Sequence, residues 1–286
     1  MDFSKINKIT CEDYTVSNQK FDLVYNDKFD MLETFPQPKL EDLGNYYESS
    51  DYISHTDSKK SFTDKLYQIV KGYTLNKKLS LINSFKTEQK NLLDVGCGTG
   101  DFLLNCKNNG WNVVGVEPNQ NAKSLAESKL TVNSISKIYT NLSDINSEKF
   151  DVITLWHVLE HVTNLEVYIL NLKQLLKPNG VLVIAVPNFK SYDANYYKQF
   201  WAAFDVPRHL WHFSKKSIQL LFSKENMAVE KILPMKFDSF YVSLLSEKYK
   251  NGKSNFISAF YVGLLSNLKA LSSKEYSSLI YLIKNI

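Results

Sequence analysis

The chain has 286 residues, 44% of them hydrophobic and 22% charged, which is an ordinary composition for a folded globular protein. The net charge of +4 comes from 34 basic and 30 acidic residues, and the lysines lie in scattered pairs, so no basic stripe for nucleic acid is expected. Three cysteines without a CxxC pair argue against a disulfide framework or a cysteine zinc module. The start of the sequence lacks the apolar core of a signal peptide and no apolar run is long enough to span a bilayer, so we expect a cytoplasmic protein without an integral membrane segment.

Residues 1–60 show no clear period and carry turn signals such as Pro36 and Pro38. They are expected to form an irregular N-terminal extension. Ser61 and Asp64 then have the spacing of a helix capping box, and the apolar residues that follow recur at helical spacing. A single domain is therefore expected over residues 61–286.

From residue 91 the sequence alternates between strand and helix patterns. The expected strands are 91–95, 112–117, 134–140, 150–156 and 181–186, with helices at 101–110, 119–129 and 164–180. Apolar strands separated by helices predict an α/β, Rossmann-like parallel sheet with helices on both faces. Right-handed crossovers place the carboxyl ends of such strands along one edge, where ligands bind.

The C-terminal part continues this pattern with an interruption. A helix is expected at 214–226, a strand at 227–235 and a final apolar strand at 277–284. Between the last two, residues of about 237–275 are expected to form a helical insertion.

Three alternating glycines follow the first of these strands in the sequence LLDVGCGTGDFL, residues 92–103. Gly96, Gly98 and Gly100 permit positive φ and close approach of a ligand to the backbone. Asp94 precedes the turn and Asp101 opens the next helix. Two carboxylates here would repel a pyrophosphate and suit a cation, which favours S-adenosylmethionine (SAM) over a dinucleotide.

Glu117 ends the second strand of the α/β region. A carboxylate at this point can accept hydrogen bonds from both hydroxyls of a ribose, in NAD sites and in SAM sites alike. Glu117 therefore indicates an adenosine cofactor without choosing between the two.

Four blocks occur in a characteristic order: LLDVGCGTG, VVGVEPN, FDVITLWHVLEHV and LLKPNGVLVIAVPN. Over roughly residues 88–190 the chain resembles the class I SAM-dependent methyltransferases, and DVPRHLWHFS is similar to the subgroup that includes the ubiquinone-biosynthesis O-methyltransferases. The resemblance implies a seven-stranded, mostly parallel sheet whose last strand, here residues 277–284, is antiparallel. It also implies SAM as cofactor, with S-adenosylhomocysteine (SAH) as product.

The resemblance further implies a set of cofactor-binding residues, ordered by the part of SAM that each would contact. They are Asp94, Gly96 and Gly98 for the methionine part, Glu117 for the ribose, Asn141 and Leu142 for the adenine, Trp156 and His157 near the sulfonium, and Tyr47, Tyr52 and His55 in a lid, with Gly100 and Pro118 as further cofactor-binding residues.

Four of the five histidines lie between residues 157 and 212. A hydroxyl acceptor has to lose a proton, which a histidine can take, and His161 and His209 are the candidate catalytic bases. Either could instead be a structural histidine bonded to the backbone. Arg208 could bind an acidic group of a substrate or pair with a neighbouring carboxylate.

The sequence HVLEH, residues 157–161, also matches an inverted zinc-peptidase motif. On a helix, His157 and His161 would share a face and bind zinc, with Glu160 as general base. However, nothing marks a third ligand, and a peptidase has no need of the glycine turn. We therefore expect no metal, and keep a zinc hydrolase and a non-catalytic SAM-binding module as alternatives.

The sequence thus predicts a SAM-dependent methyltransferase acting on a small molecule, at a hydroxyl or phenol oxygen. Aromatic residues concentrated in QFWAAFDVPRHLWHF, residues 199–213, favour a lipophilic or aromatic acceptor. An RNA or protein substrate is less favoured because the chain has no basic tail. The acceptor's identity and the oligomeric state are not specified by the sequence.

Overall fold

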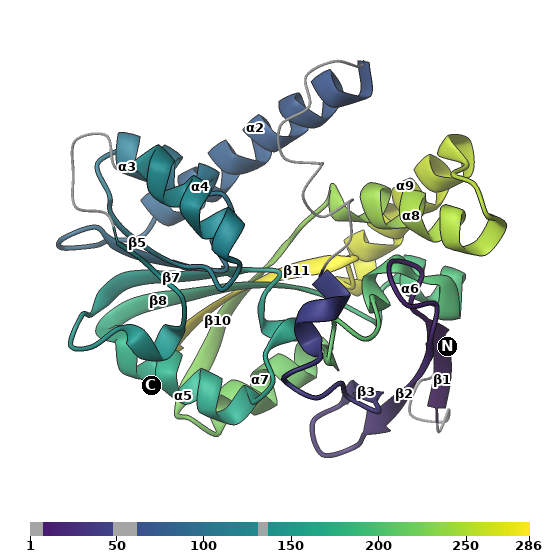
Figure 1. Cartoon of the computed structure of the whole chain (residues 1–286), viewed down its shortest axis with the longest axis horizontal. Helices are drawn as coiled ribbons and strands as arrows, with labels where there is room; N and C mark the ends of the chain where they lie inside the picture. Colours follow the sequence, from purple (N-terminus) through teal and green to yellow (C-terminus); the bar gives the residue numbers. More distant parts are fainter. Residues whose placement is uncertain (1–7, 48–61, 131–136) are drawn as a thin grey trace. The chain divides into compact units, whose positions relative to one another are not determined.

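The computed structural model describes residues 8–47, 62–130 and 137–286 (Figure 1). Its strands are β1 (Lys8–Glu12), β2 (Lys20–Asn26), β3 (Met31–Phe35), β4 (Asn91–Val95), β5 (Asn112–Val116), β6 (Lys137–Tyr139), β7 (Phe150–Trp156), β8 (Leu176–Pro187), β9 (Trp211–His212), β10 (Met227–Pro234) and β11 (Ser278–Asn285). Its α-helices are α2 (Phe62–Asn83), α3 (Asp101–Asn108), α4 (Gln120–Leu130), α5 (Leu165–Leu175), α6 (Tyr192–Tyr197), α7 (Lys215–Ser223), α8 (Asp238–Asn251) and α9 (Phe256–Ser273). Short 3-10 helices are η2 (Leu43–Tyr47), η3 (Leu142–Asp144), η4 (Leu159–His161), η5 (Lys198–Phe200) and η6 (Ala202–Phe204).

The chain divides into two compact units. The first unit comprises Met1–Ser49, His157–Glu166 and Ile184–Leu282, and the second comprises Ser50–Trp156, Val167–Val183 and Ile283–Ile286. The glycine turn lies in the second unit, and the four histidines between residues 157 and 212 lie in the first.

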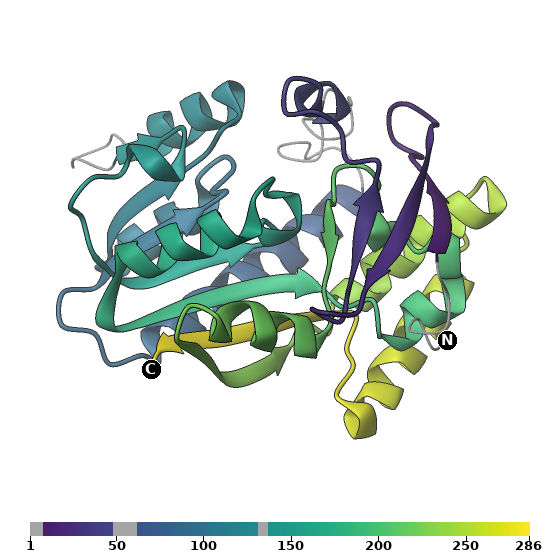
Figure 2. The same cartoon turned by 90° about the horizontal axis from the view of Figure 1, so that it is seen from below.

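Seven strands form one sheet in the order β10-β11-β8-β7-β4-β5-β6. The pairs β4–β5, β4–β7 and β5–β6 are parallel, whereas β11 runs against β8 (Figure 2). The expected Rossmann-like, mostly parallel sheet with an antiparallel last strand is confirmed.

The centre of this sheet is apolar on both faces. Leu92, Leu93 and Val152 are fully buried, as parallel strands covered by helices require. In the parallel register, Asp94 of β4 lies opposite Gly115 of β5 and Thr154 of β7. The register therefore sets a carboxylate beside a hydroxyl near the carboxyl ends of the strands.

The N-terminal residues differ from the irregular extension expected from the sequence. β1, β2 and β3 form an antiparallel sheet that β9 completes. The strands are short and alternate, with Phe21 and Leu23 buried and Val24 exposed, a period-2 pattern too brief to stand out from the surrounding turn residues. Asp13 stabilises the first turn, since its carboxylate accepts hydrogen bonds from Thr15 and Ser17.

α8 and α9 occupy the range in which the sequence predicts a helical insertion. They lie side by side (Figure 1), and a Cβ on Gly263 of α9 would lie 2.8 Å from the Phe240 ring of α8, so glycine permits their close approach. Across the described ranges we found no helix with both the length and the apolar character needed to cross a membrane.

Candidate functional site

The glycine turn between β4 and α3 has the backbone that its sequence predicts. Gly96, Gly98 and Gly100 all have positive φ, at 71°, 53° and 78°. The N–H groups of Gly96 and Cys97 donate to the Val116 carbonyl at 2.8 and 3.0 Å, which fastens the turn to β5. A Cβ on Gly98 would meet no atom of the described residues within 4 Å. Gly98 therefore leaves open space beside its backbone, as a cradle for a ligand requires.

Glu117 holds the turn from the end of β5. Its carboxylate is buried and accepts hydrogen bonds from the N–H of Gly98 at 2.8 Å and of Asn119 at 2.9 Å. Burial raises the pKa of Glu117. Each carboxylate oxygen keeps a second lone pair, so the group could accept from ribose hydroxyls while it holds the loop.

Asp94 is buried at the end of β4, and Thr154 of β7 donates a hydrogen bond of 2.6 Å to its carboxylate. Burial raises the pKa of Asp94 to about 7, although Thr154 and Lys78 oppose the shift. Sequence analysis missed Thr154. The available signal was a hydroxyl among apolar residues in a strand whose first six residues are all buried.

Asp101 has a different role from the one its position suggested. Lys71 of α2 and Lys129 of α4 contact its carboxylate at 2.6 and 2.7 Å. Burial opposes ionisation, but these two ammonium groups hold the pKa of Asp101 below its usual value. Since the lysines balance its charge, Asp101 is a poor basis for selecting a cationic ligand, and that part of the sequence argument was wrong.

Trp156, the last residue of β7, lies among groups of the second unit. Its ring packs edge to face with Phe102 at 5.9 Å, and the Lys78 ammonium lies 4.3 Å from its centroid. The indole Nε1 is buried and has no acceptor among the described residues. Lys78, which sequence analysis did not identify, thus adds positive charge beside Trp156 and Asp94.

The residues expected near the adenine follow β6 directly. The Asn141 N–H donates to the Asp144 carboxylate at 2.9 Å, and this contact opens the short helix η3. Leu142 is buried, whereas Asn141 is exposed. Both are placed at the carboxyl end of a parallel strand, where the fold presents residues to ligands.

The HVLEH segment does not form the helix that a zinc-peptidase motif needs. His157 has φ +59° and only Leu159–His161 is helical, as a single 3-10 turn. His157 contacts Asp238 of α8 at 3.1 Å and Glu160 at 3.3 Å. Burial disfavours its charged form, but the two carboxylates outweigh this and raise the pKa of His157 to about 10.

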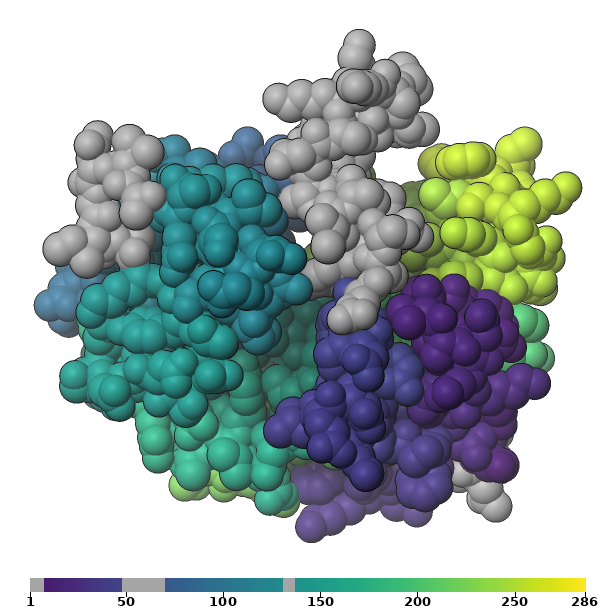
Figure 3. All heavy atoms as spheres, viewed as in Figure 1, coloured from purple at the N-terminus to yellow at the C-terminus, as the bar shows by residue number. Residues whose placement is uncertain are grey.

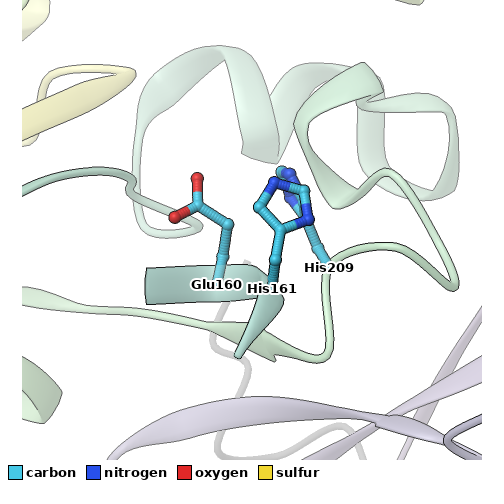
Figure 4. A group of neighbouring side chains, drawn as sticks. All are labelled: Glu160, His161 and His209. Carbon is cyan, nitrogen blue, oxygen red and sulfur yellow. The ribbon is translucent and has the colours of Figure 1, made fainter. Parts of the chain in front are cut away.

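Glu160, His161 and His209 instead form a cluster within the first unit (Figure 4). One potential ligand atom of each lies within 4.8 Å of the others. The imidazole rings of His161 and His209 meet edge to face, with centroids 4.6 Å apart. A backbone bond from the Leu210 N–H to the Glu160 carbonyl, 2.8 Å long, brings the two segments together.

Both imidazoles of the cluster are fixed by backbone carbonyls. Nδ1 of His161 lies 3.0 Å from the Arg208 carbonyl and Nδ1 of His209 lies 2.9 Å from the Ala203 carbonyl. A carbonyl oxygen only accepts, so each Nδ1 carries the proton and each Nε2 keeps a lone pair. Burial and the neighbouring His161 lower the pKa of His209 well below its usual value.

Glu160 supplies the negative charge of this cluster. It is fully buried, and its Oε2 has no hydrogen-bond partner among the described residues. Burial would raise the pKa of Glu160, but the hydrogen bond from His157 and the nearby imidazoles hold it below the usual value. The three residues could hold a metal ion. Ligand atoms at the upper end of this range would have to draw together, because two metal–ligand bonds of about 2.1 Å span at most about 4.2 Å.

Tyr47 ends η2, and its hydroxyl lies 2.9 Å from Nδ1 of His161. This contact links the expected lid segment to the histidine cluster within the first unit. Tyr52 and His55, the other two lid candidates, and Ser61 of the expected capping box lie outside the described residues.

The aromatic residues expected to wall an acceptor pocket are mostly core residues of the first unit. Trp201, Phe204 and Phe213 are almost fully buried, and Trp201 donates from its indole to Asp193 at 2.8 Å. They therefore give no support for a lipophilic acceptor. Arg208 pairs with Asp205 at 2.6 Å, in agreement with a structural ion pair.

The seven-stranded sheet, the glycine turn after β4 and the buried acid after β5 define a Rossmann-like enzyme class that uses an adenosine cofactor. A family model described as a methyltransferase domain matches residues 68–232, more than half of the chain. The chain belongs to this family, the SAM-dependent methyltransferases of class I.

Two curated relatives are both ubiquinone biosynthesis O-methyltransferases. That of Rickettsia bellii (strain OSU 85-389) is 29% identical over 151 residues, which cover 50% of this chain and 62% of the relative. That of Rickettsia canadensis (strain McKiel) is 34% identical over 100 residues, covering 34% and 42%. The chain thus spans less than two thirds of the length of the curated relatives that it matches.

Solved structures agree with this fold. Magnesium protoporphyrin IX methyltransferase from Synechocystis PCC 6803 with bound SAM matches with a TM-score of 0.54 at 14% identity, covering 87% of this chain and 100% of that one. A cyclopropane synthase from Mycobacterium tuberculosis matches with a TM-score of 0.53 at 16% identity, covering 87% and 99%. At these identities the likeness supports the fold alone.

Proposed function

We propose that this chain transfers the methyl group of SAM to a hydroxyl or phenol oxygen of a small-molecule acceptor. The observation that carries the choice of oxygen is the cluster of His161 and His209, whose Nε2 lone pairs can take a hydroxyl proton. Membership of the methyltransferase family and the O-methyltransferase names of the curated relatives support the proposal.

SAM, when bound, supplies a methyl group already activated by a sulfonium, so the enzyme's tasks are to orient the acceptor and to exclude water. The absence of a side chain at Gly98 would let the cofactor contact the backbone. Glu117 would accept hydrogen bonds from the ribose hydroxyls of SAM, and Asp94 would accept a hydrogen bond from its ammonium group. Gly96, Gly100, Pro118, Asn141, Leu142, Trp156 and His157 complete the proposed set. The lid role of Tyr47, Tyr52 and His55 remains part of the proposal.

His209 is the preferred base of the two. It is neutral because burial and His161 depress its pKa, and its ring is fixed by the Ala203 carbonyl. When the acceptor hydroxyl loses its proton to Nε2, the resulting imidazolium lies beside the Glu160 carboxylate. That carboxylate stabilises the charge that develops on the ring.

The test is product analysis with purified protein, SAM and a panel of phenols, alcohols and amines. We expect SAH and an O-methylated product from at least one phenol, identified by mass spectrometry. Methylation confined to amines would contradict the oxygen acceptor. SAM binding without SAH formation by any acceptor in the panel would favour the non-catalytic binding module instead.

Within the described part of the chain, Oε2 of Glu160 has no hydrogen-bond partner. This favours a second candidate role for the cluster, in which Glu160, His161 and His209 hold a divalent cation. A cation there would bind an acceptor oxygen and lower the pKa of its hydroxyl. Treatment with a chelator distinguishes the roles. If a histidine is the base, the enzyme retains its turnover after metal removal. If the cluster holds a cation, the enzyme loses its turnover and regains it with added Mg²⁺ or Zn²⁺.

A further inference from the structure

The outer face of α9 carries a row of exposed apolar side chains. Ile257 is 85% exposed, Phe256 67%, Tyr261 61% and Phe260 60%. Three leucines continue the row: Leu264, Leu268 and Leu271. Figure 3 shows part of the α8–α9 pair, in yellow-green to yellow, at the surface of the first unit. Exposed apolar surface on this scale marks a binding surface for protein or membrane.

The seven residues lie on one side of the helix. At 100° per residue they fall within an arc of about 140°, and no charged residue lies between them in that arc. The opposite side packs against the first unit through small residues, among them Ala259, Gly263 and Ser266. The Gly263–Phe240 approach and the stacking of Phe260 on Phe240 at 5.4 Å hold α9 against α8. The apolar row therefore lies on a helix whose position is held by packing within the first unit.

The helix pair that carries this row has an excess of exposed positive charge. Residues 236–274 contain six lysines and two acidic residues. All six lysines are exposed: Lys236, Lys248, Lys250, Lys253, Lys269 and Lys274. Glu247 is buried and bonded to Tyr197 and Ser258, and Asp238 pairs with His157. Both acidic groups of the helix pair are therefore paired. Lys250 and Lys269 lie over the rings of Tyr196 and Tyr192 of α6, and the other four lysines remain as exposed positive charge on the helix pair.

We propose that α9 is a membrane-binding surface that lies on a bilayer containing anionic lipid. Its apolar row would enter the boundary between headgroups and acyl chains, and the lysines would contact the lipid phosphates. An 18-residue helix is about 27 Å long, and packing along one side against the first unit fits a position in the plane of the membrane. This inference concerns binding alone and does not rest on methyl transfer.

Charge favours lipid over a second copy of this chain. A symmetric dimer through α9 would place the same patch on both sides of the interface. Exposed lysines of the helix pair in one copy would then approach those of the other copy. The two acidic residues of each helix pair could not offset this, because both are bonded within their own copy. An anionic bilayer instead supplies the opposite charge over the same area.

The experiment is co-sedimentation of the whole chain with vesicles of phosphatidylcholine alone or with 30% phosphatidylglycerol, without SAM. We expect at least tenfold stronger partitioning onto the anionic vesicles at low salt, weakening as salt screens the charges. The pair Ile257→Glu and Phe260→Glu should reduce partitioning at least tenfold. Lys248→Gln with Lys253→Gln should reduce it by roughly fivefold per lysine.

The control variants are Leu125→Glu, an exposed leucine on α4, and Lys86→Gln with Lys216→Gln, two exposed lysines elsewhere. Both should partition like the wild type.

Tyr261→Trp should report insertion through a blue-shifted fluorescence that brominated lipids quench. The proposal fails if anionic vesicles bind no protein, if the α9 variants bind like the wild type, or if Tyr261→Trp is not quenched. A dimer that Ile257→Glu and Phe260→Glu dissociate, without vesicle binding, would assign the face to a second copy instead. Unchanged thermal unfolding of the α9 variants establishes that their folding is intact.

Discussion

The rings of His161 and His209 meet edge to face at 4.6 Å, and Nδ1 of each ring is bonded to a backbone carbonyl. This arrangement fixes both rings. A proton on His161 disfavours a second proton on His209, because like charges repel in a buried site. His209 is therefore held neutral, with the carboxylates of Glu160 and Asp205 near its ring.

The first prediction concerns this pair. His209→Gln should lower the rate of methyl transfer to a phenol by about 10² to 10⁴-fold, the usual contribution of a general base. SAM affinity, measured by calorimetry, should stay within about twofold of the wild type. The matched control is His212→Gln, since His212 is also buried but bonds Thr34 outside the cluster. Equal losses of rate in the two variants would remove His209 from the mechanism.

The sequence predicted the part of the site that is local in the chain. Strand, turn and helix around Gly96, Gly98 and Gly100 follow one another within residues 91–108, so periodicity and backbone preference suffice to place them. The same holds for Glu117 at the end of β5. The cluster of Glu160, His161 and His209 could not be predicted as a unit, because long-range backbone pairing creates it.

The ion-pair partners of the charged residues could not be predicted from the sequence either. Asp101 opens α3 as expected, but its partners Lys71 and Lys129 come from two other helices. Likewise, His157 is bound by Asp238, at the start of an insertion 81 positions later. A one-dimensional pattern carries no information on such partners. The electrostatic meaning of an acid near a ligand turn thus depends on tertiary contacts.

The second prediction uses Asp94. In the free protein its pKa is about 7, and the cationic ammonium of SAM favours the ionised form. Affinity for SAM should therefore rise as pH increases from 5.5 to 7.5, with a limiting slope of about tenfold per pH unit. Calorimetric titrations across this range measure the effect.

Asp94→Asn should bind SAM weakly and without this pH dependence. The matched control is Asp151→Asn, because Asp151 is also buried on the sheet but bonds Asn91 and Lys177 at the amino end of β7. Asp151→Asn should retain the slope. A wild-type slope in Asp94→Asn would assign the titration to another group.

The third prediction concerns stability and pH. His157 has a pKa of about 10 in the folded chain, against about 6.5 when unfolded. Because the folded value is raised, the stabilisation is complete below pH 6.5 and is lost as pH rises toward 10. Asp238→Asn should therefore lower the free energy of unfolding most at pH 6, by about 1 kcal/mol given the partial exposure of the His157 side chain.

Urea denaturation at pH 6, 8 and 9.5 measures this difference. The gap between Asp238→Asn and the wild type should narrow as pH rises. Asp27→Asn, a change of the same charge at an exposed position, controls for net charge and should show a small, constant effect. A gap that widens with pH would contradict the ion pair.

The fourth prediction separates folding from binding within the glycine turn. Gly100 has φ +78°, and a Cβ there would lie 2.9 Å from the Ala126 Cβ, whereas Gly98 and Gly110 have positive φ with no atom within 4 Å of a Cβ. Gly100→Ala should therefore destabilise the chain by about 2–4 kcal/mol, and the other two by about 1–2 kcal/mol each. Of those two, Gly98→Ala alone should also weaken SAM binding, by at least about tenfold, because its methyl group enters the space that the cofactor needs.

Gly110→Ala, with matched backbone strain, is the control for calorimetry and urea denaturation. Equal SAM affinity in the Gly98→Ala and Gly110→Ala variants would mean that the open space beside Gly98 does not receive the cofactor.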